Sequence, residues 1–130
     1  MAITKKRAIG DLGEKVAAKF LKKNKYKIIE TNYSNKYGEI DIICSNKDYL
    51  VFVEVKTRSK DSFTTGYEAV NKKKQYNIFK TAHTYMNEYP SDKQPRFDII
   101  EVEYDKLTQK ASVREHYDNA FIQGGDYGVF

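Results

Sequence analysis

Three charged residues interrupt the two most apolar stretches of this chain, and they constrain what it can fold into. The stretches cover residues 38–44 and 49–57, and both are rich in β-branched and aromatic side chains, as β-strands are. A strand buried on both faces of a sheet is normally a continuous apolar run, and an unpaired charge there is costly. Asp41, Glu54 and Lys56 therefore need compensation, which a divalent cation held by the two carboxylates would supply.

Length and composition restrict the class of protein. The chain has 130 residues, 32% of them charged, and a formal net charge of +5. This length suits one domain with one core, so we expect a single domain at residues 1–121 and a loose tail at residues 122–130. The basic balance suits a polyanionic partner such as nucleic acid.

The sequence pattern contains no recognisable membrane helix, secretory signal or cysteine-based zinc site. No run approaches the ~20 apolar residues of a membrane helix, and residues 1–7 lack the apolar segment of a secretory signal. Cys44 is the single cysteine, so we expect a buried, inert thiol and no zinc cluster. His83 and His116 have no partner that suggests Ser-His-Asp chemistry. We therefore expect a cytoplasmic protein that does not contact a membrane.

The periodicity of the apolar residues predicts a mixed sheet flanked by helices. Helices are expected at residues 13–24, with a start that could lie a few residues earlier, and at residues 67–89. Besides the two apolar runs, strands are expected at residues 26–33 and 97–104, with a last strand or edge segment at residues 111–117 and a loop at residues 60–66. This order of elements indicates an α/β fold with a central mixed β-sheet.

The turn between the two apolar strands decides which of their residues face one another. If residues 47–48 form a two-residue hairpin loop, Asp41 lies directly opposite Glu54. Glu39 then lies opposite Lys56. Opposed residues of an antiparallel pair share a face, with Cβ atoms about 4.5–5.5 Å apart, and alternation keeps all four side chains on that face. This register gathers three carboxylates and one amine in one patch.

The excess negative charge of this patch favours a metal site. Mg²⁺ prefers oxygen ligands, typically one or two carboxylates with waters and phosphate oxygens of a substrate. Such an ion polarises a phosphodiester and helps to generate hydroxide from water. Lys56 could orient that water or neutralise charge that develops on the phosphate. The alternative is a buried salt-bridge cluster in which Glu39 pairs with Lys56 and Asp41 lies near Glu54.

The same residues resemble the PD-(D/E)XK, or restriction-endonuclease-like, nuclease superfamily, in which an Asp on one strand precedes Glu-X-Lys on the next. Over residues 8–121 the chain is similar to the bacterial YraN family (UPF0102), whose members are predicted Holliday-junction-resolvase-like endonucleases. The matching segments are Gly10-x-x-Gly13-Glu14, Asn32-Tyr33, Gly38-Glu39-Ile40-Asp41, Phe52-Val53-Glu54-Val55-Lys56-Thr57-Arg58, Ala69-Val70, Lys74-Gln75, Arg96-Phe97-Asp98 and Asn119-Ala120-Phe121. The resemblance implies a restriction-endonuclease-like fold.

The resemblance also implies roles for single residues. Asp41 and Glu54 would bind Mg²⁺ or Mn²⁺, and Val55 would offer its backbone carbonyl to the metal. Lys56 would assist the attacking water. Glu14 would complete the metal site from the first helix, although from the residues alone it is a solvent-exposed Glu at a helix start.

Other residues would surround this set. Gln75 would approach the site from the second helix and act in catalysis, and Thr57 would be an accessory residue. Glu39 could be a further ligand or the ion-pair partner of Lys56. Basic side chains near the site would hold a phosphate backbone without reading its sequence; these are Arg58, Lys72, Lys73 and Lys74. The lysines of the first helix could equally form a solvated helix face.

These observations predict a metal-dependent endonuclease that acts on branched DNA. One alternative is a nucleic-acid-binding module on a nuclease fold without catalytic activity. Another is an interaction protein whose charged cluster only sets the sheet register. Junction cutting needs two symmetric incisions, which a homodimer would suit, although no interface can be recognised in the sequence.

Overall fold

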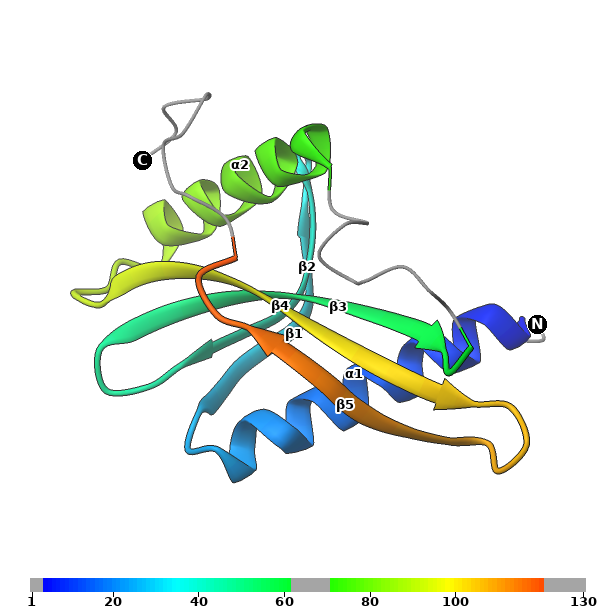
Figure 1. Cartoon of the computed structure of the whole chain (residues 1–130). Coiled ribbons are helices and arrows are strands. Elements are labelled where there is room, and N and C mark those ends of the chain that lie inside the picture. The colour runs from blue at the N-terminus through cyan, green and yellow to red at the C-terminus, as the bar shows by residue number, and fades with distance from the viewer. Residues whose placement is uncertain (1–3, 62–70, 121–130) are drawn as a thin grey trace.

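A five-stranded mixed sheet lies between two helices (Figure 1). The structure is a computed structural model that describes residues 4–61 and 71–120. Its elements are α1 (Lys5–Lys23), β1 (Lys27–Asn35), β2 (Gly38–Ser45), β3 (Tyr49–Ser59), α2 (Lys72–Glu88), β4 (Gln94–Asp105) and β5 (Lys110–Tyr117). The strands lie in chain order, β3 and β4 are parallel, and the other neighbours are antiparallel. The expected α/β class is confirmed, and the architecture is consistent with a restriction-endonuclease-like fold.

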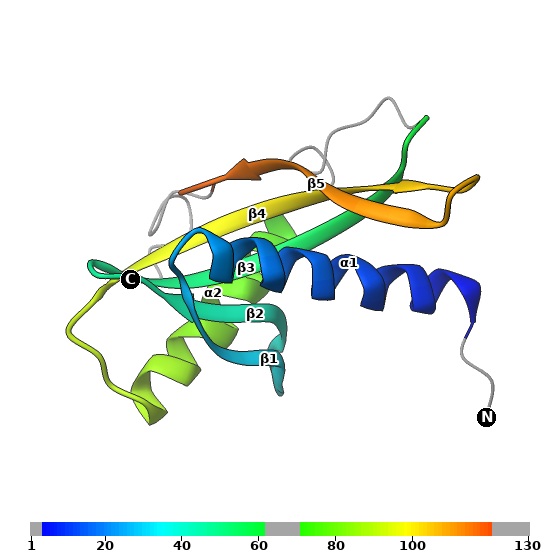
Figure 2. The same ribbon diagram turned by 90° about the horizontal axis from the view of Figure 1, so that it is seen from below.

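The two helices cover opposite faces of the sheet (Figure 2). Ala17 and Leu21 of α1 pack into one buried apolar cluster, and Phe79 of α2 packs into the other. On the α2 side, the rings of Phe79 and Phe97 meet edge to face with centroids 4.7 Å apart. Because successive strand residues point to opposite faces, each strand contributes to both clusters. Neither described helix is long and apolar enough to span a membrane.

The helix α1 begins at Lys5, well before the expected start at residue 13. Thr4 caps it, since the Thr4 side chain accepts a hydrogen bond from the backbone N–H of Arg7 at 3.2 Å, a common N-cap arrangement. Gly10 and Gly13 weaken the helical signal in this region because glycine is a poor helix former. The earlier start brings the N-terminal half of α1 alongside the end of β3.

Gly13 lets α1 lie directly against β3, which gives a first prediction. A Cβ atom at Gly13 would lie 1.8 Å from Thr57 Oγ1, whereas a Cβ at Gly10 would meet nothing within 4 Å. We expect Gly13→Ala to lower the free energy of unfolding by about 1–3 kcal/mol through overpacking. We expect Gly10→Ala to raise it by up to about 1 kcal/mol, because Ala favours the helix. Urea denaturation measures both, and equal stabilities would contradict this packing.

The helix α2 begins at Lys72, so the expected start at residue 67 is wrong. Asn71 has extended backbone, with ψ 172°, and its side chain accepts a hydrogen bond from the backbone N–H of Lys74 at 2.9 Å. An N-cap of this kind marks the residue before which a helix does not extend. The expected loop at residues 60–66 lies largely outside the described residues, as does the tail. The expected last strand is confirmed as β5.

The hairpin that joins β2 and β3 has the expected register. Asn46 donates its backbone N–H to the carbonyl of Tyr49 at 3.1 Å, and the Asn46 side chain accepts hydrogen bonds from the N–H groups of Asp48 and Tyr49. The ladder then pairs residues 45 with 50, 44 with 51, 43 with 52 and 42 with 53. The next positions along the two strands are those of Asp41 and Glu54.

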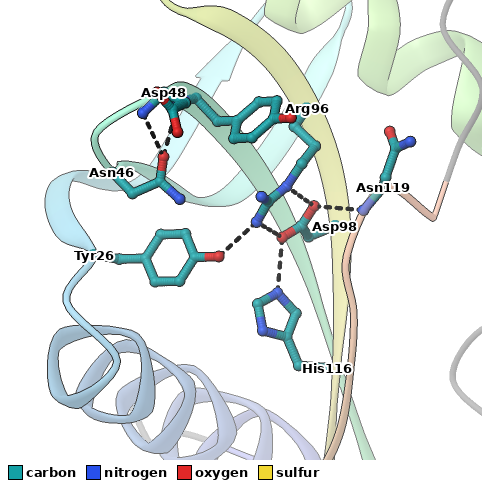
Figure 3. A network of polar contacts seen from close by, with 8 residues as sticks. Tyr26, Asn46, Asp48, Arg96, Asp98, His116 and Asn119 are labelled. Carbon is teal, nitrogen blue, oxygen red and sulfur yellow. Dashed lines mark hydrogen bonds and ion pairs between the residues drawn. The ribbon is translucent and has the colours of Figure 1, made fainter.

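A buried polar network fastens β4 to β5 and to the segment between α1 and β1 (Figure 3). Asp98 is fully buried, and its carboxylate accepts hydrogen bonds from Arg96 Nε at 2.9 Å and Nη2 at 2.8 Å. His116 Nε2 lies 2.7 Å from the same carboxylate, and the backbone N–H of Asn119 donates to it at 2.9 Å. Arg96 also donates to the hydroxyl of Tyr26 at 2.6 Å. The strand β5 therefore places His116 beside Asp98, a structural partner that the sequence did not indicate.

Cys44 lies in the core on the α1 side of the sheet, as expected. Its side chain is fully buried and packs in the same apolar cluster as Ile42 and Val51. Burial, with the negative charge of Asp98, raises the pKa of the Cys44 thiol to about 12. Since the thiolate is the reactive form of cysteine, this thiol is an inert core group.

Candidate active site

The strand β2 separates from β3 at Asp41, and this divergence forms the candidate active site. The β2–β3 ladder ends at the pair of Ile42 and Val53, and the start of β2 turns toward α2 (Figure 1). In the β1–β2 register, Thr31 pairs with Ile42 and Tyr33 with Ile40. Asn32, between the two pairs, has a left-handed φ of 54°. Ile40 packs on the α2 side and Ile42 on the α1 side. Strand alternation is therefore broken at Asp41.

The two predicted carboxylates meet at this divergence. Asp41 Oδ2 accepts a hydrogen bond from the backbone N–H of Val55 at 2.8 Å, and Glu54 is only 8% exposed. Burial and then the Glu54 charge raise the pKa of Asp41 to about 7, against the opposing effect of the Val55 hydrogen bond. Because the N–H and C=O of one strand residue point to the same edge, the Val55 carbonyl also faces this opening.

Two lysines approach Glu54 from different elements. Lys74 Nζ, in the first turn of α2, lies 2.8 Å from Glu54 Oε1, and Lys56 Nζ, on β3, lies 3.6 Å from the same oxygen. Burial and the neighbouring Lys74 lower the pKa of Lys56. Burial also acts to lower the pKa of Lys74, but the Glu54 charge and hydrogen bonds to Glu54 and Lys56 raise it overall. The proton is therefore held more firmly on Lys74 than on Lys56.

Asp41 and Glu54 line two pockets at once. The larger pocket, of about 640 Å³, lies between the N-terminal half of α1 and the end of β3, and includes Glu14, Val55, Lys56 and Thr57 with the basic residues Lys5, Lys6 and Lys106. The smaller pocket, of about 300 Å³, lies between the start of β2 and the first turns of α2, and includes Glu39, Lys74 and Asn77. The carboxylate pair is therefore accessible from both sides.

Glu14 of α1 lies at the larger pocket with Asp41 and Glu54, and its role as a metal ligand stays a prediction. The pKa of Glu14 is raised first by burial and then by the charges of Asp11, Glu54 and Glu39, against a hydrogen bond with Asn32. Sequence reasoning missed the contact of Asn32 with Glu14. A polar residue that tolerates left-handed backbone, inside an expected strand, was the available signal.

The expected pairing of Glu39 with Lys56 is wrong. Beyond the divergence, Glu39 pairs with Ser34 of β1, and it is exposed at the smaller pocket. Lys56 lies at the larger pocket and pairs with Glu54 instead. The hairpin register holds only up to the point where β2 bends, so Glu39 lies with Asp41 and Glu54 at the smaller pocket but away from Lys56.

Several of the residues predicted to act at the site line neither of these two pockets. Lys72 and Lys73 are exposed in the first turn of α2, and Gln75 is half-buried in that helix. Arg58 follows Lys56 by two residues and points to the same face of β3. Within residues 4–61 and 71–120, Arg58 Nε is buried without a hydrogen-bond partner. Of the four predicted basic contacts, the structure thus brings Lys74 into the site itself.

The donor set at the divergence fits a hard cation such as Mg²⁺ or Mn²⁺. In the described parts of the chain, no three His, Cys, Asp or Glu side chains are clustered as metal ligands. Asp41, Glu54 and the Val55 carbonyl offer oxygen atoms alone, and Mg²⁺ commonly takes one or two carboxylates with waters completing its shell. The pKa of Asp41 is raised first by burial and then by the charge of Glu54, and a cation would neutralise that charge.

Comparison with known proteins places the chain in one family. The model of the uncharacterised protein family UPF0102 matches residues 13–102. The UPF0102 protein of Acetivibrio thermocellus is 46% identical over 112 residues, which cover 85% of this chain and 86% of that relative. The UPF0102 protein of Caldanaerobacter subterraneus subsp. tengcongensis is 44% identical over 117 residues, which cover 89% and 96%. The chain therefore belongs to the uncharacterised protein family UPF0102.

Proposed function

We propose that this protein is a metal-dependent endonuclease of the PD-(D/E)XK type that hydrolyses phosphodiester bonds in branched DNA. The observation that carries the proposal is the convergence of Asp41, Glu54, the Val55 carbonyl and Lys56 at the opening between β2 and β3. Two strands bring an oxygen donor set and an amine to the same point, and α1 adds Glu14. The Holliday-junction-resolvase-like substrate rests on the sequence resemblance alone.

The residues of the site have separable roles in this reaction. Asp41, Glu54 and the Val55 carbonyl would hold Mg²⁺ or Mn²⁺, with Glu14 as a further carboxylate. The bound ion would polarise the phosphodiester and lower the pKa of a bound water. The lowered pKa of Lys56 suits an amine that exchanges a proton with the attacking water, because general bases work best with a pKa near the working pH.

Basic side chains around the larger pocket support a nucleic acid as the substrate. Lys5 and Lys6 from α1 and Lys106 from the β4–β5 turn line this pocket together with Lys56. Lysine contacts to phosphates provide affinity without reading base sequence, which suits recognition of a branched shape. Symmetric incision of a junction would require two copies of the site, so a homodimer forms part of the proposal.

A binding module without catalysis is the second candidate, and one observation favours it. Glu54 pairs with both Lys74 and Lys56, so lysine side chains alone can balance its buried charge. In that case Asp41 and Glu54 would be structural, and the basic residues of the larger pocket would do all the binding. Binding of a divalent cation separates the two functions.

The test combines a substrate panel with a metal titration. End-labelled four-way junction, flap, linear duplex and single-stranded DNA are incubated with Mg²⁺, Mn²⁺ or EDTA, and we expect metal-dependent cleavage of the branched substrates. Asp41→Asn should lose both cleavage and cation binding by calorimetry, whereas Asp92→Asn, an exposed carboxylate on the α2–β4 connection, should lose neither. DNA binding without cation binding or cleavage would favour the binding module.

A further inference from the structure

Lys74 lies where a counter-ion of the carboxylate pair would lie. We propose that the Lys74 ammonium neutralises Glu54 and Asp41 in the metal-free protein and is displaced from them when a divalent cation binds. The inference rests on the proposed function, because it assumes a cation at these carboxylates. It gives Lys74 a role inside the site, beyond the phosphate contact expected from the sequence.

The contacts of Glu54 identify Lys74 as the principal counter-ion. Glu54 is 8% exposed, and a buried carboxylate without a partner is strongly destabilising. Lys74 Nζ approaches Glu54 Oε1 to 2.8 Å, which is hydrogen-bonding distance, whereas Lys56 Nζ stays at 3.6 Å. Lys74 also lines the smaller pocket together with both Glu54 and Asp41, so its ammonium lies beside the pair.

Lys74 and a bound cation would compete for the same oxygen atoms. A divalent ion on Glu54 would repel an ammonium group at this distance, because like charges in a partly buried site interact strongly. The Lys74 side chain can move away, since it is 40% exposed and lies in the smaller pocket beside Asn77. Because its four-carbon stem is flexible, the released ammonium would be free to meet a substrate phosphate near the first turn of α2.

This competition has a measurable thermodynamic consequence. Cation binding must include the free energy of separating Lys74 from Glu54, so the apparent affinity of the wild-type site is lower than that of the same carboxylates without Lys74. Removal of the ammonium should therefore have opposite effects on two properties. It should destabilise the metal-free protein and strengthen cation binding.

The experiment compares Lys74→Met with two controls. We expect Lys74→Met to lower the unfolding temperature in EDTA. We also expect it to bind Mn²⁺ and Mg²⁺ about tenfold more tightly by calorimetry, because the cation no longer has to break the Lys74–Glu54 ion pair. Lys74→Arg keeps the charge and should remain close to wild type in both measurements. Lys73→Met removes an equal charge from an exposed position in the same turn, and should change cation affinity much less.

The outcomes separate this inference from the proposed function. If the wild type binds the cation and Lys74→Met binds it equally or more weakly, the counter-ion role is overturned while the metal site stands. If neither protein binds a cation, both proposals are overturned. Should Lys74→Met fail to fold, the test is made on the wild-type protein instead, by following the NMR signal of the Lys74 side-chain ammonium group. That signal should shift on Mg²⁺ titration, and an unchanged signal at saturation would overturn the inference.

Discussion

Lys56→Ala should reduce Mg²⁺-dependent cleavage by about 10²–10⁴-fold, the usual contribution of a positioned acid or base. Lys56 is the amine of the larger pocket that lies beside Glu54, at 3.6 Å, and its lowered pKa makes it the better proton acceptor of the two site lysines. The reduction should appear in kcat, because the metal donors Asp41 and Glu54 remain. Single-turnover cleavage of a labelled branched substrate gives the rate.

Two further variants show how Lys56 acts. Lys56→Arg keeps a positive charge but cannot take a proton from water, so restored cleavage would assign an electrostatic role and continued loss would assign proton transfer. Lys106→Ala, at the rim of the same pocket, should weaken DNA binding in a salt-dependent way. Thermal unfolding confirms that each variant is folded. Undiminished cleavage by Lys56→Ala would contradict the proposed mechanism.

Asp98→Ala should lower the free energy of unfolding by about 3–5 kcal/mol, as removal of one partner from a buried ion pair does. Asp98 is fully buried and accepts hydrogen bonds from two atoms of Arg96 and from the backbone of Asn119. Its loss would leave the Arg96 guanidinium, which is 8% exposed, without its carboxylate. Urea denaturation at neutral pH measures the effect, and an exposed control, Asp118→Ala, should change stability little.

The same network predicts how stability depends on pH. Burial acts to raise the pKa of Asp98, but hydrogen bonds from His116, Arg96 and Asn119 hold it below the ordinary value of 3.8. The contribution of ionised Asp98 to the free energy of unfolding is therefore complete above pH 3.8, the ordinary pKa of an Asp. It is lost as the pH falls through the lower pKa that Asp98 has in the folded protein. Acid denaturation should be less steep in Asp98→Asn than in the wild type. Parallel acid titrations of the two proteins would contradict this assignment.

The hairpin shows why part of the site could be predicted. A two-residue loop fixes which residues of β2 and β3 face each other, and the observed pairing of residues 45 with 50 through 42 with 53 is the expected one. Because this rule is local, it brings Asp41 and Glu54 together without knowledge of the rest of the fold. It fails at Glu39, where β2 leaves β3 and follows β1.

The helix starts show where local patterns mislead. Glycine at positions 10 and 13 lowers the helix propensity of this region, yet α1 runs through both residues. Gly13 is favoured there because a larger side chain would collide with Thr57. For α2, an apparently helical pattern extended to residue 67, but Asn71 caps the helix. In both cases a specific interaction, the Gly13–Thr57 contact or the Asn71 cap, outweighed the average helix propensity of the residues.

The residues that complete the site depend on how separate elements are oriented. Lys74 was expected to be a peripheral phosphate contact, and the rotation of α2 places it 2.8 Å from Glu54. Asn32 reaches Glu14 because left-handed backbone at φ 54° breaks the strand pattern there. No periodicity in the sequence encodes either contact, since each depends on how one element is oriented against the next in the folded chain.

The sequence by itself determined the α/β class, the hairpin register and the three charges that make the apolar strands anomalous, because these depend on side-chain alternation and a short turn. Tertiary structure alone decided that Glu39 lies away from Lys56 and that Lys74 pairs with Glu54. It also placed Glu14 beside the carboxylates and gave His116 a buried partner. The physical reason is that these contacts follow from the bend of β2 and from the docking of the helices and β5, which are set by long-range packing.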